Sequence, residues 1–368
     1  MSDFIDDLCK RVELAARNNT QLRPVGGGTK NFYGGPLQGE EVDMRQWAGI
    51  VEYEPTELVI TAKPGTPLAE VEAALAAQKQ ELAFEPPRLG LNGTIGGAIA
   101  SGLAGPARLS RGGVKDYVLG CTLLDGKGQL LHFGGVVMKN VAGYDVSRLM
   151  AGAWGTLGLL TEVSLKVLPV APGEATLRFD DINQADALRK LHAWGGQPLP
   201  LNASCWVQDG GVGTLYVRLR GAVAAVEAAC ERMAREAGGT RMDNAQAGPD
   251  WADCRDQRLP FFTAPAPDLA LWRLSVAPSA PALELPWSQL IEWHGAQRWL
   301  WAPVDAAERL RTAAARAGGH ATLFRAPANG LPEGVSRRTP TTGPLAQIEQ
   351  RLREAFDPAG IFNAGKLA

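Results

Sequence analysis

The sequence predicts an α+β protein of two domains, a first domain built around glycine-rich loops and a second built on antiparallel strands. Five dense glycine clusters lie within the first 170 residues. A stretch rich in proline and glycine, residues 169–173, follows a strand pattern and marks the domain boundary. Beyond it, strand patterns precede amphipathic helices, which is typical of an antiparallel α+β domain. The 368 residues suffice for two medium-sized cores.

The first domain is predicted to begin with a helix and a short strand. Phe4, Leu8 and Val12 recur at intervals of four residues, which indicates one buried helix face. Residues 22–25 form an apolar strand that runs directly into a glycine loop. Residues 58–62 form another strand, and the helix after it is predicted to start with Thr66 as its N-cap and Pro67 in its first turn.

The rest of the first domain is predicted to be a loop region, a hairpin and a strand. Residues 86–113 are so rich in Gly, Ala, Pro and Ser that they form either loop or closely packed backbone. Residues 117–124 and 129–133 bracket a glycine-containing turn, the pattern of a β-hairpin. Residues 162–169 alternate as a strand that ends at proline.

In the second domain, strands are predicted at residues 203–207, 215–219, 272–276 and 298–301. A helix with Val223, Val226, Cys230 and Met233 on its inner face follows the second of these, and Asp305 is predicted to cap another helix. The domains are therefore placed at residues 1–171 and 172–343. A closing helix and tail, residues 344–368, are predicted to return to the first domain.

The charge and hydropathy of the chain exclude several functional classes. A net charge of −2 and a pI near 6.2 provide no basic surface for nucleic acid. The acidic N-terminus lacks the pattern of a secretory signal, and no uncharged apolar run is long enough to cross a bilayer. We therefore expect a cytoplasmic protein with no transmembrane segment, which reaches the inner face of the cytoplasmic membrane only through partners.

The cysteines and histidines are scattered. No C-x-x-C or closely spaced histidine pair occurs, so we expect no metal site and no iron–sulfur cluster in this chain. The five cysteines are expected to be reduced and mostly buried. These isolated residues are Cys9, Cys121, Cys205, Cys230 and Cys254, with His132, His192, His294 and His320.

The first glycine cluster, residues 26–30, follows a strand. Backbone N–H groups without Cβ atoms around them can wrap closely around a phosphate. The loop fits neither the Walker pattern nor the Rossmann fingerprint. Taken alone, it is equally a tight turn that needs positive φ angles.

Further glycine clusters favour a ligand over simple turns. They lie at residues 93–102, 112–118, 134–145 and 152–162. Two backbone surfaces without side chains can face each other across an elongated ligand that carries a pyrophosphate in its middle.

This ordered series resembles the FAD-linked oxidases of the vanillyl-alcohol-oxidase (PCMH) type. Residues 24–30 and 93–98 look like the two pyrophosphate loops of that family, and residues 112–120 and 155–162 are similar to its later flavin-contacting segments. Within the family, residues 139–145 and 356–366 are similar to the FAD subunits of bacterial glycolate oxidases.

The resemblance implies a PCMH-type FAD-binding domain of two α+β subdomains and a smaller antiparallel α+β cap domain. Because the loops offer neither His nor Cys, it also implies that FAD is bound non-covalently. The residues that the resemblance assigns to FAD binding are Pro24, Gly26, Gly27, Gly28, Thr29, Lys30, Thr94, Gly96, Gly97, Ser101, Gly113, Val114, Asp116, Lys139, Gly158, Leu160, Glu162 and Asn363.

The implied function is that of the smaller flavoprotein subunit in an assembly that oxidises glycolate to glyoxylate and passes electrons to an acceptor other than NAD. Its implied partners are a larger FAD-binding subunit and an iron–sulfur subunit. Two alternatives remain: a self-sufficient FAD-dependent oxidoreductase for another small hydroxy acid or alcohol, and a non-catalytic scaffold that keeps the flavin-type fold.

Oxidation of a 2-hydroxy acid needs a base and cations for the carboxylate besides the flavin. His294 and Arg298 are the nearest candidates, although the pattern favours a strand with an edge histidine and a stacked arginine. Arg337 and Arg338 either bind the substrate carboxylate or belong to a solvent-exposed turn. Catalytic residues therefore stay unassigned. Four tryptophans lie close together in the sequence and line a pocket, form a subunit contact or pack in the core. They are Trp287, Trp293, Trp299 and Trp301.

Overall fold

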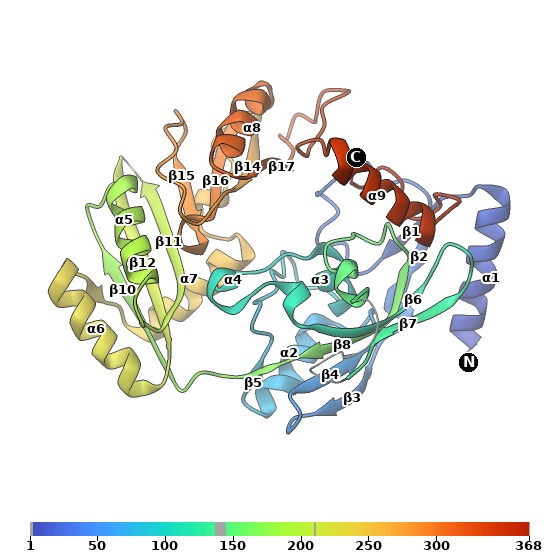
Figure 1. Ribbon diagram of the computed structural model, residues 1–368, viewed down its shortest axis with the longest axis horizontal. Helices are drawn as coiled ribbons and strands as arrows, with labels where there is room; N and C mark the ends of the chain where they lie inside the picture. The colour runs from blue at the N-terminus through green and yellow to red at the C-terminus, as the bar shows by residue number, and fades with distance from the viewer. Residues whose placement is uncertain (1–2, 137–144, 210, 368) are drawn as a thin grey trace. The chain divides into compact units, whose positions relative to one another are not determined.

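The computed structural model describes residues 3–136, 145–209 and 211–367, which form two compact units (Figure 1). The first unit contains Met1–Ala104, Gly112–Val170 and Pro340–Ala368. The second contains Gly105–Arg111 and Ala171–Thr339. The short segment Gly105–Arg111, which we expected in the first domain, thus packs within the second unit.

The first unit contains two α+β subdomains, and the smaller one joins both ends of the chain. Its strands β1 (Leu22–Val25) and β2 (Glu40–Asp43) pair in parallel. Helix α1 (Asp3–Asn18) buries Leu8 and Val12 against them, as the four-residue spacing predicted. Leu22 also forms a parallel bridge with Phe362 from the C-terminal tail, so the tail completes this core.

The larger subdomain is a five-stranded antiparallel sheet in the order β3-β4-β8-β6-β7. The predicted hairpin and the strand after it are confirmed as β6, β7 and β8. The predicted cap of the following helix is wrong: Pro67 is the N-cap, and the Thr66 hydroxyl bonds the backbone of Gly49 and Lys63 instead. The elements are β3 (Ile50–Glu54), β4 (Val59–Ala62), β6 (Val118–Leu124), β7 (Leu130–Gly134), β8 (Leu159–Lys166), α2 (Leu68–Ala77) and α3 (Ile95–Ser101).

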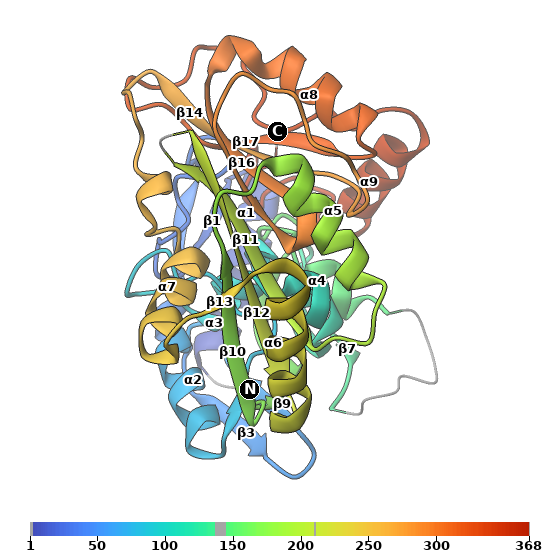
Figure 2. The ribbon, with the colours of Figure 1, turned by 90° about the vertical axis from the view of Figure 1, so that its left-hand side faces the viewer.

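The described part of the second unit is built on an eight-stranded antiparallel sheet, in the order β13-β10-β12-β11-β15-β16-β14-β17. Helices α5 and α6 pack on one face of β10, β11 and β12 (Figure 2), because alternate strand residues such as Leu177 and Val217 point toward them. The strands are β10 (Gly173–Phe179), β11 (Leu201–Asp209), β12 (Val212–Gly221), β13 (Thr240–Arg241), β14 (Leu269–Ser275), β15 (Gln289–Glu292), β16 (Gln297–Pro303) and β17 (His320–Arg325).

The helices of the second unit follow its strands. The expected cap at Asp305 is wrong, because Asp305 lies within a 3₁₀ turn, η6 (Val304–Ala306), and Ala306 is the N-cap of the next helix. The helices are α4 (Arg108–Arg111), α5 (Gln184–Gly195), α6 (Val223–Ala237), α7 (Asn244–Asp256) and α8 (Ala307–Arg316).

Short elements complete the described chain. They are β5 (Gln80–Glu81) paired with β9 (Leu168–Pro169), and the 3₁₀ turns η1 (Met44–Gln46), η2 (Val114–Asp116), η3 (Ser147–Met150), η4 (Pro260–Phe262) and η5 (Trp293–Gly295).

The C-terminal tail is fixed to the first unit by one carboxylate. After α9 (Gly343–Phe356), the buried Asp357 accepts hydrogen bonds from the backbone N–H groups of Ile361 (3.1 Å) and Phe362 (2.8 Å). Burial, the largest cause, raises the pKa of Asp357 although these N–H groups oppose the shift. The turn places Ile361 and Phe362 in the core beside Leu22.

We predict that Asp357→Ala lowers the free energy of unfolding by about 1–3 kcal/mol, because it leaves two buried N–H groups without an acceptor. Urea unfolding measures the loss. The control is Glu354→Ala on α9, which removes only a hydrogen bond with Gln350 on an exposed surface. Equal stability of the two variants would contradict the assignment.

Candidate functional site

A cavity of about 140 Å³ lies within the first unit, and both subdomains contribute to its lining. Four segments distant in sequence form its walls: the loop after β1, the start of α3, the segment before β8, and the C-terminal tail. The site therefore depends on pairing of the two chain ends.

The first glycine loop presents backbone donors to this cavity. Gly27, Gly28 and Thr29 line it, and no acceptor for their N–H groups exists among the described residues. Gly28 has a φ angle of +69°, and its carbonyl accepts the N–H of Asn31 at 3.0 Å to close the turn. Successive N–H groups of this kind form an anion-binding concavity.

Two glycines are required by contacts between protein segments. A Cβ on Gly27 would lie 1.5 Å from the carbonyl oxygen of Asn92. A Cβ on Gly96 would lie 2.5 Å from Cβ of Pro64. We expected these glycines to be needed for close approach of a ligand, whereas here they let loops pack against their neighbours.

The third wall is tied to the C-terminal tail. Asn363 donates its side-chain amide to the carbonyl of Trp154 at 2.6 Å, and the indole of Trp154 stacks on Tyr33 with ring centroids 4.4 Å apart. Gly155 has a φ angle of +69°, and a Cβ there would meet Pro24 at 2.9 Å. Asn363 thus fixes the wall as well as lining the cavity.

The charge around the cavity is positive. Arg23, Lys30 and Lys366 line it, whereas no Asp or Glu among the described residues does. Arg23 forms an ion pair with Glu41 on β2, but its buried Nε has no partner in the described structure. Lys30 and Lys366 are both buried. Unbonded N–H groups and buried cations together suit a diphosphate.

Most of the expected cofactor residues come together here. The twelve that line the cavity are Pro24, Gly26, Gly27, Gly28, Thr29, Lys30, Thr94, Gly96, Gly97, Gly158, Leu160 and Asn363. Ser101, Gly113, Val114, Asp116 and Glu162 do not line it, and Lys139 lies outside the described residues. Contact of each residue with FAD stays a prediction.

The residues away from the cavity have structural partners. The Ser101 hydroxyl donates to the carbonyl of Ala98, Asp116 accepts the N–H of Gly113 at 2.8 Å, and Val114 lies in the core. Conversely, the expected cofactor residues did not include Arg23, Trp154, Gly155 or Lys366. Gly155 and Lys366 nevertheless lie in the segments 155–162 and 356–366 that carry the resemblance, so these motifs held a signal for them.

Comparison with known proteins places this geometry in a family. The FAD binding domain family matches residues 4–134. The chain is 42% identical over 365 residues to the glycolate oxidase subunit GlcE of Escherichia coli, covering 99% of this chain and 97% of that protein. The chain belongs to the GlcE family.

Two further comparisons cover different shares of the chain. The glycolate oxidase subunit GlcD of Bacillus subtilis is 31% identical over 176 residues, which is 47% of this chain and 37% of GlcD. The structure of p-cresol methylhydroxylase aligns with a TM-score of 0.72 at 13% identity, covering 99% of this chain and 87% of that one. This likeness confirms the predicted PCMH-type fold.

The chain binds FAD, and the cavity residues fit part of that cofactor. About 140 Å³ is less than the ~300 Å³ that small ligand pockets usually provide. The enclosed part therefore has room for the diphosphate region, and the rest of the dinucleotide must extend beyond it.

His294 and Arg298 lie in the second unit and do not form a base and clamp. Arg298 is fully buried, and its guanidinium donates to the carbonyls of Gly295 (2.7 Å), Ala280 (3.3 Å) and Pro281 (3.3 Å). Burial lowers the pKa of Arg298 to about 10. Its Nη1 is buried without a partner among the described residues, and the whole side chain is enclosed by protein, so a substrate carboxylate does not reach it.

His294 lies in η5 with a φ angle of +50°, and its Nε2 is 3.1 Å from the Ser110 hydroxyl. Its Nδ1 is buried without a partner in the described structure, and burial lowers its pKa to about 4. The imidazole is therefore neutral near pH 7 and is a weak base.

The remaining candidates lie at a sheet edge, in the core, or in the lining of a second cavity. The backbone of Arg337 and Arg338 joins the edge of β17, where the carbonyl of Arg337 accepts the N–H of Leu323 at 2.7 Å. Trp299 is buried and donates to Glu292 at 2.6 Å. Trp287 and Trp301 line a second cavity.

In the described ranges, no cluster of three or more His, Cys, Asp or Glu residues could hold a metal ion. No described helix is long and apolar enough to cross a membrane.

We predict that Gly27→Asp and Gly96→Asp each abolish FAD binding, because a side chain would force the packed loops apart and add negative charge near the cofactor. Overpacking typically costs about 1–3 kcal/mol before the charge acts. FAD content of the purified variants, read from the visible absorbance, is the measurement.

The matched control for these variants is Gly248→Asp. Gly248 is exposed on α7, and a Cβ there meets nothing within 4 Å. Full FAD content in folded Gly27→Asp would overturn the assignment of the loop.

We predict that burial of His294 makes stability depend on pH. Its pKa of about 4 lies below the unfolded value near 6.5, so the unfolded chain binds the proton more readily. Stability from this group is complete above about pH 6.5 and is lost as the pH falls toward 4.

The variant His294→Asn keeps a residue that tolerates positive φ and removes the titration. Between pH 7 and pH 5, wild type should lose about 1–2 kcal/mol more free energy of unfolding than the variant, measured with urea. Parallel losses would show that His294 does not titrate as described.

Proposed function

We propose that this chain is the FAD-binding subunit of an assembly that oxidises glycolate to glyoxylate and passes the electrons to an acceptor other than NAD. The observation that carries the proposal is the 42% identity to GlcE over 99% of the chain. A likeness confined to the flavin loops would support only a flavoprotein. Here the likeness also includes the second unit and the tail.

The proposal gives the cavity residues defined roles. The N–H groups of Gly27, Gly28 and Thr29 would hold the diphosphate, with charge supplied by Lys30 and Lys366. When bound, FAD supplies the hydride acceptor. Because no Cys or His among the described residues lines the cavity, we propose that FAD is bound non-covalently there.

The chemistry of the substrate supports a division of labour. Removal of hydride from glycolate requires a base for the hydroxyl proton, and a positioned base typically contributes ~10²–10⁴-fold. His294 is a weak base with a pKa of about 4, and Arg298 is bonded to backbone carbonyls. We therefore propose that the larger flavin subunit supplies the base.

The proposed partners are that larger FAD-binding subunit and an iron–sulfur subunit. The five cysteines of this chain are free thiols, and burial raises the pKa of Cys121 to about 12. An unreactive thiol of this kind supports a role in packing. We place the assembly in the cytoplasm, at the inner face of the cytoplasmic membrane through its partners.

We predict that the isolated, FAD-loaded chain does not oxidise glycolate at a useful rate, whereas the assembled complex does. Anaerobic stopped-flow mixing with glycolate, followed by flavin absorbance, measures both. The isolated chain should be at least about 100-fold slower, the lower range of what a positioned base contributes.

Two controls make the result interpretable. Acid precipitation of the loaded chain should release all of its FAD, because the binding is non-covalent. The complex that carries His294→Ala in this subunit should keep its rate. Rapid bleaching of the isolated chain would establish a self-sufficient oxidoreductase, and lack of FAD in the native chain would establish a scaffold.

A further inference from the structure

A larger cavity, of about 690 Å³, lies within the second unit on the face of the sheet opposite α5 and α6. Thr176, Tyr216 and Leu290 line it, and each alternates along its strand with residues that pack on those helices. Helix α7 lies across this face (Figure 1) and contributes Trp251. The volume is that of roughly 20 water molecules, well within the range of ligand pockets.

The aromatic walls of this cavity are held by the protein itself. Trp251 donates its indole N–H to Thr176 at 2.9 Å, and the guanidinium of Arg218 lies 5.0 Å from its ring. Trp301 donates to the carbonyl of Phe261 at 2.7 Å. The indole N–H groups of Trp251 and Trp301 are thus already bonded, so these two side chains offer a ligand flat apolar faces and no donors.

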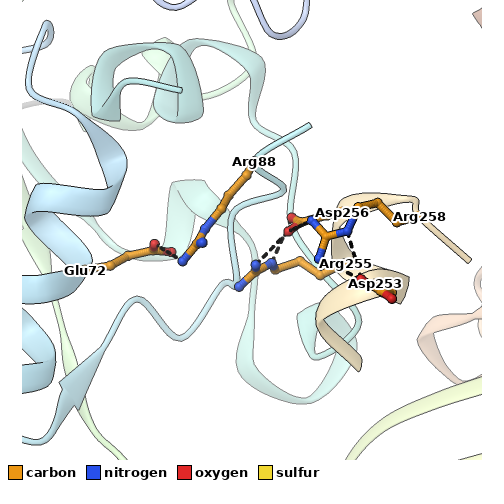
Figure 3. A network of polar contacts seen from close by, with 6 residues as sticks. All are labelled: Glu72, Arg88, Asp253, Arg255, Asp256 and Arg258. Carbon is orange, nitrogen blue, oxygen red and sulfur yellow. Dashed lines mark hydrogen bonds and ion pairs between the residues drawn. The ribbon is translucent and has the colours of Figure 1, made fainter. Parts of the chain in front are cut away.

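A local network of charges surrounds the C-terminal end of helix α7 and the turn that follows it. The buried Asp256 accepts from Arg255 at 2.8 Å and from Arg258 at 2.9 Å, and Arg258 also binds Asp253 (Figure 3). The Glu72 and Arg88 pair, drawn in the same figure, belongs to the first unit. The contact that holds Trp251 against the sheet is its hydrogen bond with Thr176 on β10.

The charge of the cavity excludes small anions. No Lys, Arg or His among the described residues lines it, and its only charged residue, Asp250, is exposed. A glycolate carboxylate placed here would find no cation and would lose its hydration. The lining therefore selects a neutral molecule.

The polar residues of the lining include Gln208, Thr263, Ser288 and Tyr216, and the phenol of Tyr216 can orient such a ligand. Tyr216 is half-buried in the lining, and burial, the largest cause, raises the pKa of its phenol. The phenol therefore stays protonated and can donate a hydrogen bond to a neutral acceptor such as a carbonyl oxygen.

We propose that this cavity binds a neutral, largely apolar ring compound that carries a carbonyl acceptor, of the quinone class. Flat indole walls suit a ring, the absence of lining cations excludes an acid, and the Tyr216 phenol fits a ring carbonyl. The proposal concerns binding and goes beyond the proposed function, since it needs neither bound FAD nor glycolate.

The test is isothermal titration calorimetry of the full chain with duroquinone, a neutral quinone that is fully substituted and does not arylate thiols. Saturable binding with a dissociation constant of about 10–100 μM is expected for so small a ligand. Glycolate and the ringless 1-decanol are titrated in parallel, and each should bind at least about tenfold more weakly.

Two variants locate the binding. Val207→Trp places an indole in the cavity and should weaken duroquinone at least about tenfold, because the ring position becomes filled. Val212→Trp, on the same hairpin but outside the cavity and exposed, is the matched control and should bind within about twofold of wild type. Tyr216→Phe keeps the shape and should cost about 2- to 10-fold, the value of one hydrogen bond.

Each other result overturns the proposal. The proposal fails if duroquinone shows no saturable binding. It also fails if Tyr216→Phe and Val207→Trp both bind duroquinone with wild-type affinity while Val207→Trp keeps the wild-type unfolding midpoint. If 1-decanol binds as tightly as duroquinone, the cavity does not select a ring compound. If glycolate binds and Val207→Trp weakens that binding, the cavity is an anion site. None of these results bears on glycolate oxidation, so failure here and failure of the proposed function are distinguishable.

Discussion

The cofactor site depends on one close approach, the contact of the first glycine loop with the carbonyl of Asn92. At Gly27 the two backbones leave no space for a Cβ. This approach directs the next N–H groups into the cavity rather than toward the protein. Pro24, at the end of β1, then lies against Gly155, so the third wall is set by the same loop. The shape of the cofactor cavity results from backbone packing, and the side chains add mainly charge.

Local patterns predicted the elements well because their causes are local. The spacing of Leu8 and Val12 gave α1, and alternation with a glycine turn gave the β6 and β7 hairpin. Helix starts were less predictable, since Thr66 and Asp305 are good caps whose positions are decided by other contacts. Membership of the segment Gly105–Arg111 in the second unit has no local signal at all, because long-range packing determines it.

The candidate site was predictable where glycine carries the signal. Twelve of the expected cofactor residues share one lining, yet Arg23 emerged only from the structure, since a single cation outside any motif looks like any other in a sequence. His294 and Arg298 show the reverse problem. They are close in sequence, but Arg298 is buried among carbonyls and His294 bonds Ser110. Proximity along the chain does not determine the direction of a side chain.

The bridge between Leu22 and Phe362 affects how the protein folds during its synthesis. The carbonyl and N–H of Leu22 pair with residues 361–363, so β1 lacks these partners until those residues have been synthesised. At typical synthesis speeds of about 5–20 residues per second, the interval is roughly 20–70 s. During that time the first glycine loop is present, but Ile361 and Phe362, which complete the core beside Leu22, are not. Formation of the complete β1 pairing therefore waits for residues 361–363, which are made long after the glycine loop that they help to hold.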